Sequence, residues 1–441
     1  MEQFLRQLQT IPEAAELIRR VEEGGCPAAV SGLQPVQRAC VGAAVAAACG
    51  RPAVFLCGDE REVQVLSADL ETLTGRRPVT LLGREWQFRP GAVGSRDWER
   101  SRLAALYALA QGDAPVVVAT ADGLMARTLP PETLRSLAIT LEVGGQAELG
   151  ALAEQLLSAG YTRCEQVEGV GQFALRGGIL DVFSPLMDQP VRCEFFDDEI
   201  DSMGAFDPGT QRRIRNVSSA RILPAAEVLP HCAPGGLPGL ADQLTALAEK
   251  LAKKQKTEAI VQTLREDAER LRSGAAPGAA DRYLAAIYPT VTAGVHYLPP
   301  DAVVFLSESG RVDERVKNTV LQQKQDVEAL LSAGVLAGEY AHLTLTAEEL
   351  YAALEDFPVI LEDSLPTSRH PLRPRGLLTM NAKQLSSYGG SLETAVTDLE
   401  HYRSSGSAVL VLCGGETRAK NLHRLLEEKG IPATLDLSGA A

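Results

Sequence analysis

Short, uninterrupted apolar runs that end in turn residues recur through the first third of the chain. Four of them begin at a proline or alanine and read PAAVSG, PAVFLCG, PVTLLG and APVVVATADG. A strand that is covered on both faces needs apolar side chains on both faces, as these runs supply. Segments with helical apolar spacing lie between them, for example residues 60–75, which end at a glycine. This alternation predicts an α/β fold, with an N-terminal helix and one open α/β domain over residues 1–137.

The pattern changes after residue 137. Residues 138–223 contain strands in hairpin-like succession and one amphipathic helix, which predicts a small inserted α+β domain. A single long helix is predicted over residues 239–273, within a segment, 224–352, that returns to the first domain. A strand, loop, helix and strand in residues 406–437 are typical of a βαβ unit and predict a further small α/β domain over residues 353–441.

The net charge and the hydropathy of the chain limit the classes of partner that it can bind. The net charge is −14, which disfavours duplex DNA as a direct partner. A basic run, KLAKKQK, is followed by acidic residues, and a solvated helix face is favoured there over a DNA site. No apolar run approaches the roughly 18 residues of a membrane span, and the N-terminus is charged and amphipathic. We therefore expect a cytoplasmic protein without a membrane partner.

Metal sites are not expected. The eight cysteines are far apart in sequence and form no C-x-x-C pair, so we expect them to be reduced and mostly buried rather than zinc ligands. Four acidic residues follow the strand that ends at Phe196: Asp197, Asp198, Glu199 and Asp201. They lack the regular spacing of a calcium loop, which favours an exposed turn or an interaction edge.

Catalytic motifs are not found. An ATP-driven motor needs a glycine-rich loop with Lys and Ser or Thr, but the chain has no Gly-Lys dipeptide, and VSGLQPVQRA follows the first strand. Asp59 and Glu60 follow a strand as a magnesium pair would, but without that loop the magnesium role is disfavoured. CGGET at 413–417 is a weak candidate for an anion-binding turn. The six histidines are scattered. We therefore expect a chain that is not an enzyme.

One strand raises a question about an aromatic side chain. Side chains alternate along PVRCEFF, so Phe196 shares a face with Arg192 and Glu194. Two interpretations remain open. Phe196 could cover the helix of its own domain while the arginines pair with the acidic turn at 197–199. Alternatively, this face could be an exposed surface that binds a partner.

Several separated motifs are together similar to one family. FALRGGILDVFSP and PVRCEFFDDEIDSMGAFDPGTQRR resemble the UvrB homology module of the bacterial transcription-repair coupling factors (Mfd). ILPAAEVLP, DRYLAAIYPTV, YLPPDAVVFLSESGRVDE and the segment SYGGSLETAVTDLEHYRSSGSAVLVLCGGET extend the resemblance over nearly the whole chain.

The resemblance implies a degenerate RecA/helicase-like module. In UvrB-like chains a lysine loop follows the first strand and an Asp-Glu-Ser-His motif follows a later strand. The matching places here read SGLQPV and Ser307-Glu308-Ser309-Gly310, so the Walker A lysine and the Walker B aspartate are absent. The family therefore implies a motor fold kept as a non-catalytic scaffold. No cofactor is expected in this chain, because ATP and magnesium belong to translocase domains outside it.

The resemblance also implies a partner. The small domain of the family docks onto UvrA, and the binding residues of the family match Arg176, Arg192 and Phe196. The chain is expected to be an N-terminal fragment whose UvrA site, masked in the full protein by a C-terminal domain, is open. RNA polymerase and DNA would be bound by the absent domains. Two rival functions are a UvrB-like or helicase-type nucleotide-dependent DNA repair enzyme, and an interaction module with another partner.

Overall fold

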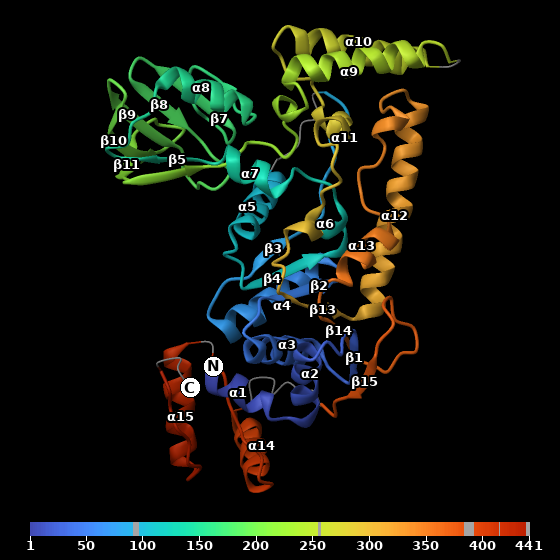
Figure 1. The fold of residues 1–441 in the computed structure, drawn as a ribbon. Coiled ribbons are helices and arrows are strands. Elements are labelled where there is room, and N and C mark those ends of the chain that lie inside the picture. Colours follow the sequence, from blue (N-terminus) through green and yellow to red (C-terminus); the bar gives the residue numbers. More distant parts are fainter. Residues whose placement is uncertain (91–96, 255–256, 383–391, 414, 438–441) are drawn as a thin grey trace.

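The computed structural model describes residues 1–90, 97–254, 257–382, 392–413 and 415–437. Its centre is a seven-stranded parallel sheet with the order β15-β1-β14-β13-β2-β4-β3 (Figure 1). The strands are β1 Ala28–Ser31, β2 Ala53–Cys57, β3 Val79–Leu81, β4 Val116–Thr120, β13 Val303–Ser307, β14 Val359–Asp363 and β15 Gly376–Thr379. The four apolar runs named above form β1, β2, β3 and β4. The predicted mixed α/β class is confirmed.

Each face of the parallel sheet has its own apolar core. Alternate residues of β2 show this, because Phe55 belongs to one core and Val54 and Leu56 to the other. The first core packs under α1 Glu2–Gln9, α2 Pro12–Glu22, α3 Pro35–Cys49 and α4 Glu60–Thr74. Small residues let α3 approach closely, since a Cβ at Gly42 would lie 2.5 Å from the ring of Phe55.

The second core lies on the opposite face and continues beyond the sheet. It includes residues of α5 Asp97–Gln111, α6 Ala121–Met125, α7 Pro131–Leu137, α9 Gly236–Leu251, α10 Glu258–Arg272, α11 Leu284–Ile287, α12 Ser309–Ser332 and α13 Ala347–Leu354. Short 3-10 turns at 230–232, 280–283, 294–297 and 338–340 connect these helices.

The long helix predicted over residues 239–273 is wrong. The structure has two helices there, α9 and α10, which lie side by side as a hairpin (Figure 1). Thr257 donates its hydroxyl to the carbonyl oxygens of Leu251 and Lys254 and so closes the turn between them. Leucines of both helices, for example Leu244 and Leu264, are buried in the second core.

The domain boundary predicted at residue 353 is also wrong. β14 pairs in parallel with both β1 and β13, and β15 pairs with β1 at the sheet edge. Residues 359–379 therefore complete the first sheet and do not begin a new domain. Parallel strands pair regardless of their separation along the chain, and local sequence patterns carry no signal for which sheet receives them.

The small domain contains a six-stranded sheet with the order β11-β10-β9-β8-β7-β6. Its strands are β6 Thr162–Arg163, β7 Gln172–Arg176, β8 Ile179–Val182, β9 Val191–Phe196, β10 Glu199–Phe206 and β11 Arg213–Asn216. Only one face is covered by a helix, α8 Leu149–Ser158, through Leu152 and Leu156. The chain enters at β5 Ile139–Glu142 and leaves at β12 Ser219–Ile222, which pair with each other.

Hydrogen bonds to α5 fasten the small domain to the rest of the chain. Arg100 donates Nε to the carbonyl of Pro185 at 2.8 Å. Arg221 donates Nη1 to the hydroxyl of Tyr107, also at 2.8 Å. Arg100 and Tyr107 lie about two turns apart on α5, so the helix holds the domain at two points.

The last described segment forms two helices, α14 Leu392–Ser404 and α15 Glu416–Glu428. Val396 and Leu426 pack together between them. The βαβ unit predicted here is wrong for the described residues, because neither 407–413 nor 431–437 forms a strand. The apolar residues Val409–Leu412 are 42–52% exposed and have no neighbouring strand to pair with in the described chain. All of SYGGS, residues 387–391 at the start of the quoted segment, and Gly414 of CGGET lie outside the described residues.

Candidate functional site

The face of the small sheet that α8 does not cover gathers the predicted binding residues, beside a small apolar cluster that includes Ala174 and Phe206. Val191 and Cys193 of β9 are buried under α8, whereas Arg192 is half-buried and Phe196 is exposed on the other face. Asp181 of β8 pairs in register with Arg192. Arg176 ends β7, two residues beyond Ala174, which pairs with Asp181. The alternation predicted for β9 is confirmed, and we call this face, with Arg176, Asp181, Arg192, Phe196, Ser202 and Arg213, the docking face.

A buried carboxylate holds both arginines of the docking face. Arg192 donates Nε and Nη2 to the two carboxylate oxygens of Asp181 at 2.7 and 2.8 Å. Arg176 donates Nη2 to Oδ2 of the same carboxylate at 2.5 Å. The Asp181 side chain is fully buried, whereas those of Arg176 and Arg192 are 46% and 20% exposed. The hydrogen bonds with Asp181 raise the pKa of Arg192, so this guanidinium stays charged.

Arg192 is also held from its other side. Gln211 accepts from Nη1 through its backbone oxygen at 3.4 Å and from Nη2 through Oε1 at 3.2 Å. The guanidinium carbon lies 4.6 Å from the centre of the Phe206 ring, a cation–π distance. Gln211 has a left-handed backbone, φ +60°. Its amide donates to the carbonyls of Val167 and Pro208, which hold it in that conformation.

Phe196 stands on a rigid hairpin tip. It pairs with Glu199 across a two-residue turn whose first residue, Asp197, has φ +53°. The turn is tied to the preceding loop, since Ala147 N donates to Asp198 O at 2.8 Å and Gly144 N donates to Ile200 O at 2.8 Å. The ring is 75% exposed. Phe196 thus does not cover α8, and Arg176 and Arg192 pair with Asp181 and not with the acidic turn. The interpretation in which Phe196 covers the helix of its own domain is therefore wrong.

Residues that the sequence analysis did not select complete the docking face. Arg213 of β11 donates Nη2 to Ser202 Oγ at 3.0 Å, and Ser202 donates to Glu194 at 2.7 Å. Gly204 makes this path possible, because a Cβ there would lie 2.1 Å from Arg213 Nε. Asp181 could have been identified by alternation along ILDV opposite Arg192. The partners of Gln211 and Arg213 depend on strand register, which the sequence does not specify.

The helix that follows β1 carries a buried arginine in its first turn. α3 begins at Pro35 directly after β1, and Arg38 in its first turn is buried, with 3% of its side chain exposed. Arg38 donates to Glu308 at 2.6 Å and to Glu62 at 3.2 Å. It also donates to the carbonyl of Leu33 at 3.2 Å. The guanidinium therefore neutralises two carboxylates at the carboxyl ends of the strands, where a nucleotide fold would bind phosphate.

Acidic side chains crowd the end of β14 beside this arginine. Glu362 is fully buried and neither carboxylate oxygen has a hydrogen-bond partner in the described residues. Burial raises the pKa of Glu362 well above its ordinary value, so we assign it as the neutral acid. Burial also raises the pKa of Asp363, although that carboxylate accepts from Ser309 N and Oγ at 2.9 Å. Both carboxyl groups are buried in the interior and are therefore not accessible to a ligand.

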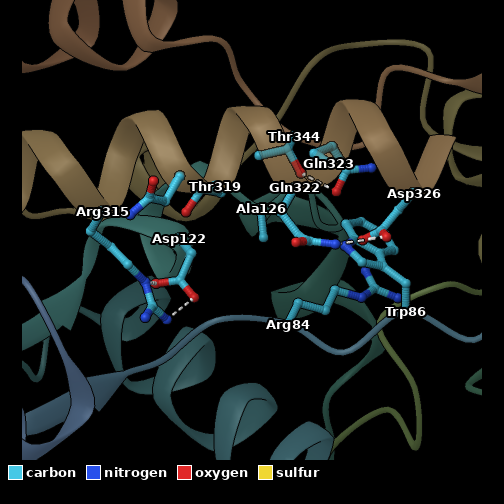
Figure 2. Close-up of a pocket in the computed structure, with 11 residues that line it drawn as sticks. Arg84, Trp86, Asp122, Ala126, Arg315, Thr319, Gln322, Gln323, Asp326 and Thr344 are labelled. Atoms are coloured by element: carbon cyan, nitrogen blue, oxygen red, sulfur yellow. Dashed lines mark hydrogen bonds and ion pairs between the residues drawn. The ribbon is translucent and has the colours of Figure 1, made fainter. Parts of the chain in front are cut away.

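A separate hollow lies over the carboxyl ends of β3 and β4, against α12 (Figure 2). Its volume is about 370 Å³ and its lining is mostly polar, including Thr319, Gln322, Gln323 and Thr344. The charged side chains at its rim are engaged within the protein. Arg315 donates to Asp122 at 2.7 Å, and Arg84 pairs with Asp281 at 2.6 Å and lies over the ring of Trp86. Asp326, another charged residue of the lining, is exposed and accepts from the neutral amide of Gln322 at 2.9 Å, with no cationic partner among the described residues.

The cysteines and acidic side chains form no disulfide and no metal site among the described residues. The eight thiols are free, and three are buried while five are half-buried, fewer buried than expected. Burial raises the pKa of Cys193, under the docking face, to about 12. Within the described ranges no three His, Cys, Asp or Glu side chains gather as a metal site. None of the helices formed by these residues combines the length and apolar character needed to cross a bilayer.

Comparison with known proteins agrees with the resemblance. Residues 139–227 match the family described as the UvrB interaction domain. Over 423 residues the chain is 26% identical to a transcription-repair-coupling factor of Bacillus subtilis, covering 95% of this chain and 36% of that protein. A Myxococcus xanthus protein of the same name is 29% identical, with 91% and 34% covered. The predicted resemblance is confirmed, and the chain spans about a third of the length of these relatives.

Proposed function

We propose that this chain, which resembles transcription-repair-coupling factors over nearly its whole length, recruits UvrA through the docking face of its small domain. The proposal rests on one observation. Arg176, Arg192 and Phe196 share the face of the small sheet that α8 does not cover, within the segment that matches the UvrB interaction domain. A role in transcription-coupled nucleotide excision repair follows from the same resemblance.

The composition of the docking face suits protein binding. An exposed aromatic ring provides apolar area at low entropic cost, and an arginine fork binds carboxylates or carbonyl oxygens directionally. The ring of Phe196 is 75% exposed on a tip held by backbone hydrogen bonds, so little order has to be created on binding. In a longer protein this face would be masked by a C-terminal domain, which would lower the fraction competent for binding.

Calorimetric titration of the 441-residue chain with purified UvrA tests this function. We expect tight binding by the wild-type chain and losses of more than about tenfold in Arg176→Ala and Phe196→Ala. Leu377→Ala is the matched control, because Leu377 is an equally exposed apolar residue, 72%, on β15 of the other sheet. Absence of binding by the folded wild-type chain would refute the assignment of UvrA as partner and leave the docking face to another protein.

We further propose that the parallel sheet is a degenerate helicase-like scaffold without nucleotide chemistry. The support is Arg38, which is buried in the first turn of the helix that follows β1 and is paired with Glu62 and Glu308. ATP with magnesium should leave the melting temperature unchanged, since a ligand of the native state raises it. An increase that depends on ATP concentration would instead favour the rival assignment, a nucleotide-dependent UvrB-like or helicase-type enzyme. Contacts with RNA polymerase and DNA are proposed for other domains of the longer relatives.

A further inference from the structure

The two arginines of the docking face have different numbers of unengaged donors. A guanidinium carries five N–H groups. Arg192 makes four hydrogen bonds through them, two to Asp181 and two to Gln211, and so retains one N–H. Its side chain is only 20% exposed and stacks on Phe206. Arg192 is therefore largely satisfied within the domain.

Most N–H donors of Arg176, by contrast, are not engaged within the described residues. Its single hydrogen bond in the described residues is the one from Nη2 to Asp181 Oδ2. Nearly half of the side chain is exposed, and its remaining N–H groups meet no acceptor in the described part of the chain. Arg176 therefore has the donors that a partner's oxygen atoms need, and Asp181 alone restrains where the fork points.

Asp181 accepts hydrogen bonds from both arginines. It lies on β8, between the strands that carry Arg176 and Arg192, and none of its side chain is exposed. A buried carboxylate is stable only when it is paired and hydrogen-bonded, as the two hydrogen bonds from the Arg192 guanidinium achieve. The carboxylate is thereby fixed in orientation, and Oδ2 accepts from Arg176 as well.

We propose that Asp181 is the positioning residue of the docking face. It is braced by Arg192 from inside the domain and aims the Arg176 fork at the partner. This inference rests on the proposed docking function and divides its residues: Arg176 and Phe196 contact the partner, whereas Asp181 and Arg192 act through Arg176. The matching surface of the partner would carry carboxylate or carbonyl oxygens for Arg176 beside an apolar recess for Phe196.

A double-mutant cycle on UvrA binding tests the coupling. Asp181→Asn removes the charge but keeps the shape, and we expect about tenfold weaker binding. In the Arg176→Ala background the same change should weaken binding by less than about twofold, because the side chain that Asp181 aims is gone. Equal losses in both backgrounds would mean that Asp181 acts independently of Arg176, which overturns the proposal while the docking function stands.

A matched variant separates positioning from general destabilisation. Glu148 caps α8 on the opposite face of the sheet, accepting from Gly150 N and Ala151 N at 2.8 and 2.7 Å. Glu148→Gln should lower the melting temperature of the chain and leave UvrA affinity unchanged. If Glu148→Gln weakens binding as much as Asp181→Asn does, loss of stability accounts for both and the positioning role is overturned.

A readout that needs no partner distinguishes failure of the two ideas. In the chain labelled with ¹⁵N-arginine, the Nε–H signal of Arg192, assigned from its absence in Arg192→Lys, should be resolved and slow to exchange. Asp181→Asn should abolish that protection and shift the Nε–H signal of Arg176, assigned in the same way from Arg176→Lys. Unchanged signals would overturn the positioning role whatever UvrA does. If the signals change in a chain that does not bind UvrA, the proposed function is refuted. The positioning role of Asp181 would then stand, with another protein as the partner.

Discussion

Nη1 of Arg38 donates to Oε1 of Glu308 at 2.6 Å, joining the first turn of α3 to the residue that precedes α12. Glu308 has a left-handed backbone, φ +55°, and its carboxylate also accepts from Ser364 N at 3.2 Å. These contacts close the carboxyl edge of the parallel sheet between β1, β13 and β14. The pair thus fills this edge of the sheet with an internal ionic contact.

Removing Arg38 should therefore weaken the scaffold. Arg38→Ala leaves Glu62 and Glu308 without their common cation in a mostly buried setting. We expect a loss of about 3 kcal/mol in the free energy of unfolding, measured by urea denaturation. Arg19→Ala, which removes exposed ion pairs on α2, is the control and should cost less than about 1 kcal/mol. A similar small cost for Arg38→Ala would show that the buried contacts add little.

The buried acid Glu362 should make stability depend on pH. Because burial raises its pKa above the ordinary 4.5, the folded chain keeps a proton that the unfolded chain releases above that value. The free energy of unfolding should thus fall as pH rises above the ordinary pKa of 4.5 and toward the raised pKa of the folded chain, by up to roughly 1.4 kcal/mol per pH unit for one proton. Glu362→Gln cannot ionise and should flatten this decline in urea titrations.

The control for Glu362→Gln is Glu314→Gln, which changes an exposed acid on α12. It should retain the wild-type pH dependence. A decline of equal steepness in Glu362→Gln would assign the titration to other groups, of which Asp363 is the neighbouring candidate.

A lysine at position 192 should not replace the arginine. Lysine keeps the positive charge but offers one nitrogen, whereas Arg192 reaches both oxygens of Asp181 and two acceptors of Gln211. We expect Arg192→Lys to lower the free energy of unfolding by about 1–3 kcal/mol and to weaken UvrA binding. Full wild-type stability in this variant would mean that charge alone, without fork geometry, holds Asp181.

Salt should weaken the proposed interaction partly through Arg176. A half-exposed guanidinium that meets a carboxylate is screened by salt, because the Debye length shortens as ionic strength rises. We expect the affinity of the wild-type chain for UvrA to fall between low and physiological salt, and Arg176→Ala to show a shallower dependence by calorimetry. Parallel salt dependences of the two chains would argue against an ionic contact at Arg176.

Local patterns in the sequence determined most elements and one side of the candidate site. Apolar runs predicted β1, β2, β3 and β4, and period-two alternation placed Arg192 and Phe196 on one face of β9, because strand side chains alternate whatever the strand packs against. The absence of a Gly-Lys dipeptide is likewise evident from the sequence without a structure. The resemblance to the transcription-repair coupling factors, including their small domain, also depends on short motifs of neighbouring residues.

Only the tertiary structure decided which distant segments meet. It placed β14 between β1 and β13, folded the predicted long helix into a hairpin, and left residues 407–413 without a strand partner. It also gave both docking arginines to Asp181 and set Arg38 against Glu308, 270 residues away. Such pairings follow from sheet register and close packing, which depend on the whole chain at once, whereas alternation and capping depend on neighbouring residues alone.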